Sequence, residues 1–545
     1  MRRFFLFLLL ATISHTMSAQ ATVTNATQGG SGSKSYVEML HSDITRFNEA
    51  ENPDAWILVG DVQFRRDSMY MYCDSAHYFP NKNSFQAFEN VRMEQGDTLF
   101  LFGDYLDYDG DANLARVRGN VKLVDKNTTL ETDSLDFDRN ANLGYFFEYG
   151  VLYDGESTLV SYYGEYSIDT KEALFNDDVS LENPKFRMLS DILYYNTGNK
   201  VATIVGPTNI YSGESEVYSE NGRYNTSTRH AFLLDRSVLF NNKKNVTADS
   251  IFYDSANGYS EVFGNIVYTD TINKNLLLGD YAYLNEITDS AYVTNRAQVV
   301  DFSQRDSLYL HADTIWAVSY NLETDSLYRL IKAFNHVRAW GPEMQAVCDS
   351  LVFDSRDTCI TMYKDPILWN NGVQLLGEMV KIYMDSSSID WVHVINQTLY
   401  AEQLDSTFYN QIKGQEMKFF FKEGKLDEMQ VIGSVGIVFY PLDEDSTYVG
   451  MNTTETGRAI AFVKDGEVDR IIVPNRAKGV FYPISQRPND KKFLNNFAWF
   501  DYVRPLSKED IFNWRGKGSN LELKVIRRDS IPLPTLDRFR EEEEE

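Results

Sequence analysis

The sequence predicts an all-β protein assembled from stacked repeats of two strands each. A short motif recurs along most of the chain, its apolar side chains alternate with period two, and polar turn residues separate the copies. The motif, x-Asp-Ser-apolar-x-aromatic-Asp, is clearest at residues 132–138. Copies are about 26 to 36 residues apart, a period typical of solenoids, and begin near residues 73, 103, 132, 164, 190, 219, 248, 279, 312, 348 and 377.

Each repeat of roughly 29 residues contains two predicted strands and two turns. The first strand carries the motif, and we expect its Asp-Ser pair to begin the strand and to satisfy backbone donors at a turn. The second strand ends in a Gly/Asn-Val signature, as in the triplets that begin at Gly119 and Gly264. Joints such as residues 109–113 and 138–142 are rich in Asp, Asn and Gly, which favour antiparallel hairpins.

Positions four and six of the motif are apolar or aromatic in every copy. Because side chains two positions apart share one face of a strand, each of these strands has an apolar face. Such a face must pack against a second sheet, fold on itself or hold an apolar ligand, and the alternation leaves all three open. The residues predicted to form this inward face are Leu106, Tyr108, Leu135, Phe137, Leu193, Tyr195, Ile251, Tyr253, Leu351 and Phe353.

The two ends of the chain differ from the repeats. Residues 1–19 combine a basic start, a short apolar run and small residues, which is the pattern of a secretory signal peptide. The tail is expected to contain a short helix from Ser507 to about Trp514 and an acidic, disordered end. We expect the remaining chain to divide into a flexible leader, the repeats and an irregular tail, at residues 20–35, 36–483 and 484–545.

Composition and motifs exclude several classes of function. A net charge of −27 argues against nucleic-acid binding. Three cysteines cannot form a disulfide framework; Cys348 and Cys359 could at best pair locally, and buried free thiols, Cys73 included, are favoured. The sequence shows no calcium loop, zinc motif, nucleophile elbow or phosphate-binding loop, so we predict no catalytic group, metal or cofactor.

The repeated strands, and above all residues 60–99 with their GDV, MYCDSA and GDTL segments, resemble the OstA-like proteins of the Bacteroidetes. These belong with the organic solvent tolerance family, which includes the periplasmic lipopolysaccharide bridge protein. The resemblance covers about residues 36–483. It implies an elongated antiparallel β-jellyroll, or β-taco, whose apolar trough carries the acyl chains of lipopolysaccharide. The ten inward residues would then line the trough.

The resemblance implies a function without catalysis. The protein would be a lipopolysaccharide or glycolipid transport bridge, or a scaffold for outer-membrane assembly, in the periplasm and in possible association with the outer membrane. Its partners would be the lipid and the transport proteins of both membranes, which would dock through end strands. One alternative is a ligand-free structural or adhesin-like β-solenoid. Another is a polysaccharide lyase, whose cluster of Arg, Lys and Asp the sequence does not show.

Overall fold

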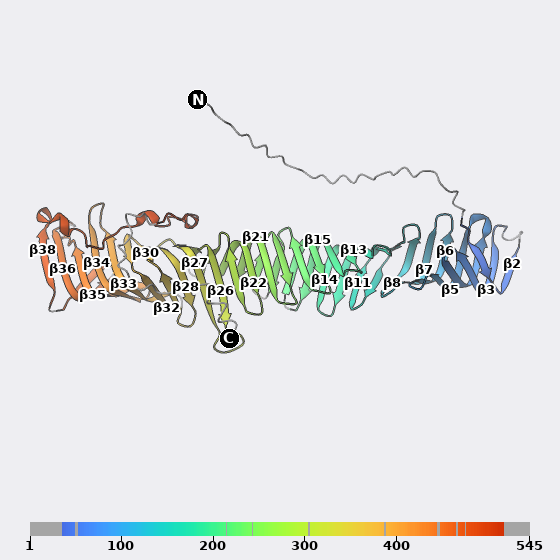
Figure 1. The fold of residues 1–545 in the computed structure, drawn as a ribbon, viewed down its shortest axis with the longest axis horizontal. Helices are drawn as coiled ribbons and strands as arrows, with labels where there is room; N and C mark the ends of the chain where they lie inside the picture. Colours follow the sequence, from blue (N-terminus) through green and yellow to red (C-terminus); the bar gives the residue numbers. More distant parts are fainter. Residues whose placement is uncertain are drawn as a thin grey trace, which may run out of the picture.

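The described residues form one elongated antiparallel β-structure whose strands are stacked along the long axis (Figure 1). The computed structural model describes residues 35–48, 53–213, 215–241, 244–303, 306–385, 388–443, 447–464, 467–474 and 476–516. Within them, 38 strands belong to a single sheet, and the predicted fold class, an elongated β-jellyroll of stacked two-strand repeats, is confirmed. The predicted signal peptide, nearly all of the predicted leader and the acidic end lie outside the described residues.

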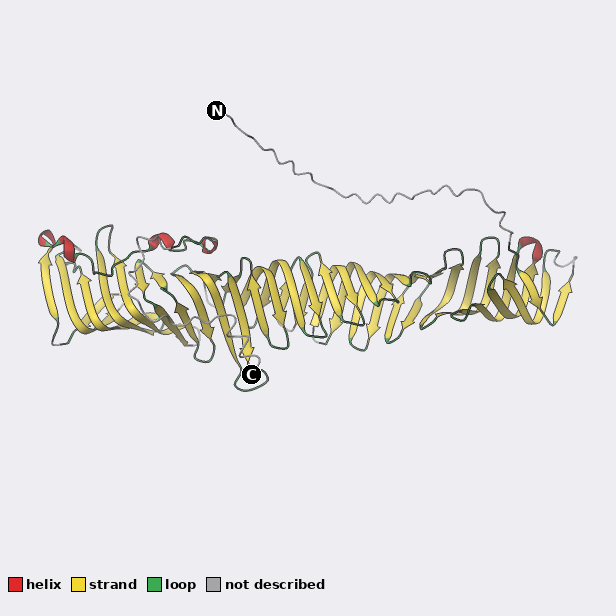
Figure 2. Ribbon diagram, viewed as in Figure 1, coloured by secondary structure: helices red, strands yellow, loops and turns green. Residues whose placement is uncertain are grey.

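The strands follow one another in chain order and are joined by short turns (Figure 2). The N-terminal strands are β1 (Glu38–His41), β2 (Ile44–Phe47), β3 (Trp56–Arg66), β4 (Met69–Phe79), β5 (Ser84–Gln95), β6 (Leu99–Asp109), β7 (Leu114–Asp125), β8 (Thr128–Asp138), β9 (Leu143–Phe146), β10 (Gly150–Asp154), β11 (Ser157–Ser161) and β12 (Tyr163–Ser167). The central strands are β13 (Glu172–Asn183), β14 (Phe186–Asn196), β15 (Val201–Ser212), β16 (Ser215–Asn225), β17 (His230–Leu234), β18 (Val238–Asn241), β19 (Lys244–Thr247), β20 (Ser250–Asp254), β21 (Tyr259–Asp270), β22 (Asn275–Asn285), β23 (Ser290–Thr294), β24 (Gln298–Asp301), β25 (Leu308–His311) and β26 (Thr314–Tyr320).

The C-terminal strands are longer on average and are followed by short 3-10 turns. These strands are β27 (Tyr328–Trp340), β28 (Met344–Asp354), β29 (Cys359–Tyr363), β30 (Ile367–Asn370), β31 (Val373–Leu376), β32 (Met379–Asp385), β33 (Ser388–Gln403), β34 (Tyr409–Lys422), β35 (Lys425–Phe439), β36 (Gly450–Lys464), β37 (Glu467–Ile472) and β38 (Lys478–Pro483). The turns that follow β38 are η2 (Ile484–Gln486), η3 (Asn489–Lys491), η4 (Asp501–Val503) and η5 (Asp510–Phe512), and one further 3-10 turn, η1 (Pro80–Lys82), lies between β4 and β5.

The long strands bend near their middle, at a β-bulge, and so contribute to two facing walls. Between β7 and β8 the register shifts at the bulge that contains Gly119 and Asn120. Wall A comprises residues 114–118 and 134–138 and their equivalents in other repeats, and wall B comprises residues 121–125 and 128–132 and their equivalents. The line along which the walls join is called the spine, and the gap between their free edges is called the mouth.

A recurring hydrogen bond holds several of the bends. The Nδ2 of Asn120 donates to Oδ2 of Asp104 over 2.6 Å, between residues 16 positions apart. Gly119 precedes this asparagine with a φ of +73°, and a Cβ added there would lie 2.7 Å from the same carboxylate oxygen. This geometry favours glycine at position 119, whereas Glu89 occupies the equivalent position before Asn90 with a φ of +60°. The same Asn-to-Asp bond, of 2.7 Å, joins Asn90 to Asp74 and Asn265 to Asp249.

The bend corrects two predictions. The Gly-Asn-Val signature lies inside β7 and does not end it, and Asp133-Ser134 lies in the middle of β8 and does not begin it. Glycine and asparagine with positive φ are typical of turns, but here they form a bulge that carries the strand around the spine. Each segment predicted as a strand is therefore one half of a bent strand.

Residues 484–516, called the strap, run back along the outer face of wall B (red in Figure 1). Phe500 and Val503 of the strap pack with Trp369 and Leu399, whose side chains point away from the main core. The buried side chain of Gln374 donates to the carbonyl of Ala498 over 2.8 Å and accepts from the Phe500 amide over 2.7 Å. Gln411 makes the same pair of bonds with the carbonyl of Lys492 and the amide of Leu494.

The strap does not contain the predicted helix. Ser507 accepts hydrogen bonds from the amides of Glu509 and Asp510 over 3.2 Å, as an N-terminal cap would. Only the single 3-10 turn η5 follows, and the backbone is extended again at Asn513. The ring of Phe512 lies 4.8 Å from that of His311 on β25, so packing against wall B keeps this segment from continuing as a helix.

The spine can be tested with Gly119→Ala, using Gly96→Ala as the control. Both glycines have positive φ, but nothing lies within 4 Å of a Cβ at Gly96. Each change should lower the free energy of unfolding by about 1–2 kcal/mol, because alanine is strained in the left-handed backbone conformation. Gly119→Ala should cost more, because its methyl group displaces Asp104. We expect faster amide hydrogen exchange in β6 to β8 for Gly119→Ala than for the control, and equal rates would contradict the proposed bend.

The strap can be tested with Gln374→Ala. This change leaves a buried amide and a buried carbonyl without partners, which should destabilise strap docking by about 1–3 kcal/mol for each group. We expect faster hydrogen exchange at Phe500 and earlier proteolytic cleavage within residues 489–512. The control is Gln63→Ala, at a half-buried glutamine whose side chain donates to the exposed carboxylate of Asp61. A strap as protected as in the unchanged protein would show that the glutamine does not hold it.

Candidate functional site

From β3 to about β20 the two walls meet, and their inward side chains fill the space between them. The rings of Phe64 and Phe85 stack with their centroids 4.2 Å apart. Across the walls, Phe186 of wall B meets Tyr224 of wall A edge to face at 4.8 Å. A void beside Phe137 measures about 10 Å³, which holds at most one water. Eight predicted inward residues lie buried in this closed section: Leu106, Tyr108, Leu135, Phe137, Leu193, Tyr195, Ile251 and Tyr253.

Buried polar contacts, called latches, tie the two free edges together in the closed section. The hydroxyl of Tyr166 in wall A donates to Oδ2 of Asp125 in wall B over 2.8 Å. Nζ of Lys171 lies 2.5 Å from the same oxygen. The latch recurs one repeat later, with bonds of 2.9 and 2.6 Å to Asp154 from Tyr195 and Lys200. Burial raises the pKa of both tyrosines well above the usual 10.0.

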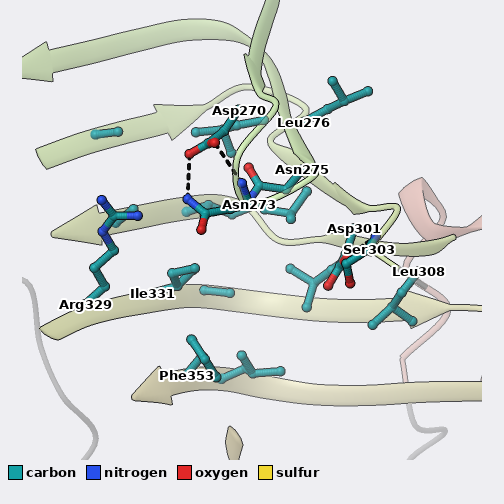
Figure 3. A pocket seen from close by; sticks show the side chains of 18 of the residues that line it. Asp270, Asn273, Asn275, Leu276, Asp301, Ser303, Leu308, Arg329, Ile331 and Phe353 are labelled. Atoms are coloured by element: carbon teal, nitrogen blue, oxygen red, sulfur yellow. Dashed lines mark hydrogen bonds between the residues drawn. The ribbon is translucent and has the colours of Figure 1, made fainter. Parts of the chain in front are cut away.

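Between β19 and β32 the walls separate around an apolar cavity of about 1220 Å³ (Figure 3). This volume exceeds the range of about 300–1,000 Å³ that is usual for sites of drug-sized ligands. Polar residues of both free edges surround the mouth, and Figure 3 shows Asp270 and Asp301 at wall B. The apolar lining comes from both walls and includes Leu277, Leu284, Leu310, Ile331, Ala333, Leu351, Phe353 and Met362.

The cavity exists because the aromatic side chains that close the N-terminal section are missing here. Position six of the motif is tyrosine or phenylalanine in most earlier repeats but becomes Leu284 and then Ala317. Asp270 is the last residue of β21, just as Asp125 is the last residue of β7. Ala317, however, occupies the position from which a latch tyrosine would reach Asp270. Asp270 instead accepts hydrogen bonds from the side chain and amide of Asn273, over 2.7 and 2.9 Å. The last ion pair found across this mouth joins Lys244 to Asp289 over 3.6 Å.

The structure divides the ten predicted residues between two environments. Leu351 and Phe353 line the cavity, whereas the other eight are packed in the closed section. Their role in lipid binding stays a prediction. Sequence reasoning missed Leu277 and Ile331, which lie in segments without the motif. The loss of the aromatic residue at Leu284 and Ala317 was the sequence signal that could have located the cavity.

Other candidate chemistry is absent from the described part of the chain. All three cysteines are free and buried, so Cys348 and Cys359 do not pair. Burial raises the pKa of the Cys73 thiol to about 12, which keeps it protonated and unreactive. Over the described ranges there is no cluster of three side chains suited to a metal ion. Nor do those ranges contain a helix with the length and hydrophobicity to cross a membrane.

The latches predict a loss of stability in alkali. Tyr166 and Tyr195 keep their protons in the folded protein at pH values where the unfolded chain, with a pKa of 10.0, has lost them. Their contribution is therefore complete below pH 10 and is lost as the pH rises further. The double variant Tyr166→Phe, Tyr195→Phe should be less stable at neutral pH by about 1–3 kcal/mol per lost bond.

The same variant should lose less stability than the unchanged protein above pH 10. Hydrogen exchange of amides in β10 to β15, measured over a pH series and corrected for intrinsic exchange, checks both expectations. Equal losses in the two proteins would show that the latches do not hold the walls.

Comparison with known proteins places the N-terminal repeats in a family. The model of the OstA-like protein family matches residues 34–191, which include the bend at Gly119 and the first latch. The cavity lies beyond the matched residues. No curated protein matches the chain. As the resemblance of residues 60–99 predicts, the match relates residues 34–191 to the OstA-like proteins.

Proposed function

We propose that this protein binds the acyl chains of lipopolysaccharide or a related glycolipid in its cavity and serves as a bridge or scaffold for outer-membrane assembly in the periplasm. The observation that carries the proposal is the apolar cavity of about 1220 Å³ between the walls of an OstA-like β-structure. Its lining is aliphatic and its edges are polar, which matches a lipid with buried chains and a solvated head group.

The binding energy for such a ligand comes from apolar contact. Transfer of acyl surface from water yields about 25 cal/mol for each Å² buried, so a cavity of this size needs no catalytic or charged anchor to hold a lipid. The closed section contributes differently. Its aromatic side chains and latches occupy the space that a lipid would need, so we assign it a supporting and spacing role.

Exposed strands at both ends support docking to membrane partners. At the N-terminal end, β1 and β2 pair with β3 and with no other strand of the described residues, and they expose Leu40 and Phe47. At the C-terminal end, β36 is the one described strand that pairs with β37 and β38, which expose Ile472 and Phe481. Unpaired strand edges of this kind accept strands from other proteins. We therefore propose transport proteins of the inner and outer membranes as partners.

A second function is a ligand-free structural or adhesin-like solenoid. The observation that favours it is the closed section, where Phe64, Phe85 and Tyr108 form a packed core without room for a ligand. The cavity between β19 and β32 is the feature that this alternative does not explain.

Photo-crosslinking separates the two functions. A photoreactive amino acid at Phe353 should capture lipid in cells, because this side chain lines the cavity. The same amino acid at Phe137, which is fully buried in the closed section, should capture none. Mass spectrometry of the adducts identifies the lipid.

The crosslinking result has clear alternatives. Capture at neither position, while a known periplasmic lipid carrier is labelled in the same cells, would favour the ligand-free solenoid. Capture at Phe137 as strongly as at Phe353 would show that the closed section opens and that lipid passes along the whole trough. Circular dichroism of each purified variant checks that the β-structure is retained.

A further inference from the structure

The last part of the strap covers the outer face of strands that line the cavity. Residues 510–515, called the strap end, include η5, which packs against β25 and β27. In the register of these two strands, Leu310 is paired with Ala339, and His311 is paired with Arg338. Leu310 and Ala339 line the cavity. Because side chains alternate between the two faces of a strand, His311 and Arg338 face outward, toward the strap end.

Two aromatic side chains of the strap end cover His311 and Arg338. The centroids of the Phe512 and His311 rings are 4.8 Å apart, and the Arg338 guanidinium lies 5.6 Å from the centroid of the Trp514 ring. His311 is 6% exposed and Arg338 is 3% exposed. Within the described residues, Nε and Nη1 of Arg338 have no hydrogen-bond partner. These surroundings solvate positive charge poorly, so a second cation beside Arg338 is unfavourable.

The hydrogen bonding and surroundings of His311 favour a neutral ring. Its Nδ1 lies 2.7 Å from the carbonyl oxygen of Ala297, which can only accept, so Nδ1 carries the proton. Acidification therefore adds the second proton at Nε2. Burial lowers the pKa of His311 below the usual 6.5, and the charges of Arg338 and Arg296 lower it further. The Ala297 carbonyl and Asp313 act in the opposite direction but do not outweigh burial.

The carboxylates near His311 already have partners. At the spine, Oδ2 of Asp313 lies 2.8 Å from Nδ1 of His336. In the strap end, Oδ1 of Asp510 lies 2.5 Å from a guanidinium nitrogen of Arg515. A proton on His311 therefore adds positive charge to a largely buried cluster whose acidic groups are engaged elsewhere.

We propose that the strap end is a pH-sensitive brace for the cavity wall, released when His311 is protonated. The imidazolium then lies near two guanidinium groups, and undocking of the strap end relieves this repulsion by letting water reach the ring. Undocking also removes Phe512 and Trp514 from the outer face of β25 and β27, whose inner face lines the cavity. This device needs no ligand, so its failure would leave the proposed lipid-binding function standing.

Hydrogen exchange of the purified full chain, measured from about pH 8 to about pH 5 and corrected for intrinsic exchange, tests the brace. Neutral His311 stabilises docking fully above pH 6.5, and this contribution is lost as the pH falls below that value. Opening of the strap end should rise about tenfold between about pH 7.5 and about pH 5.5, with a smaller rise in β25 and β27.

Asp510 does not account for such a change. Burial acts to raise the pKa of this carboxyl, but hydrogen bonds from Arg515, the Leu506 amide and Asn513 bring it below the usual 3.8. Asp510 therefore keeps its charge throughout the pH range of the experiment.

Three variants assign the effect to His311. His311→Asn keeps an amide donor and cannot titrate in this range, so its exchange should not change with pH. Arg338→Met removes a neighbouring positive charge and keeps a side chain beneath Trp514, so the pH at which the strap end opens should fall. The control is His336→Asn, which introduces the residue found at the equivalent position of the bend at Asn120. It should keep the pH dependence of the unchanged protein.

The other outcomes overturn the proposal or a part of it. Exchange of the strap end that does not depend on pH in the unchanged protein overturns it entirely. Loss of the pH dependence in His336→Asn overturns the assignment to His311 and points to the bond with Asp313. Opening of the strap end without any change in β25 and β27 overturns its role as a brace. Should His311→Asn open the strap end at every pH, Arg338→Met decides, and an opening pH that does not fall overturns the role of His311.

Discussion

The hydrogen bond from Asn120 to Asp104 at the spine is the interaction on which the rest of the structure depends. It holds a Gly-Asn pair in the left-handed conformation and so makes a continuous strand turn through the spine. Because the bends at Asn90, Asn120 and Asn265 each use an aspartate that precedes them by one strand, these repeats bend along the same line as their neighbours. That alignment produces two walls that face each other. Each repeat needs contact only with its neighbours for its bend to be aligned.

Once the walls face each other, position six of the motif decides whether the space between them is filled. Tyr166 and Tyr195 fill it and reach the opposite edge, where their hydroxyl groups meet buried aspartates. Leu284 and Ala317 are too short to do either. The same backbone therefore forms a closed, latched section and an open cavity, and a few side chains determine the difference.

Sequence alone predicted the features that depend on local pattern. Period-two alternation placed Leu135 and Phe137 inside, and the turn at Asp109 forms as expected, with its carboxylate accepting from the amides of Asp111 and Ala112. Sequence reasoning missed the features that depend on residues that are close in space but distant in the chain. The bulge at Gly119 has the composition of a turn, and the bond between Gln374 and Phe500 joins residues 126 positions apart. Leu277 lies in a segment that no motif marks.

The position of the cavity constrains how a lipid could move. If acyl chains entered the section around Asp125 and Asp154, they would have to break buried bonds to Tyr166 and Tyr195 and displace packed aromatic rings. Those costs recur in successive repeats, whereas the cavity is already open. On the proposed function, the N-terminal repeats therefore set the distance between a lipid held near β19 to β32 and a partner at β1 and β2. On the same proposal, the length of the chain provides reach, and lipid binding is confined to the repeats between β19 and β32.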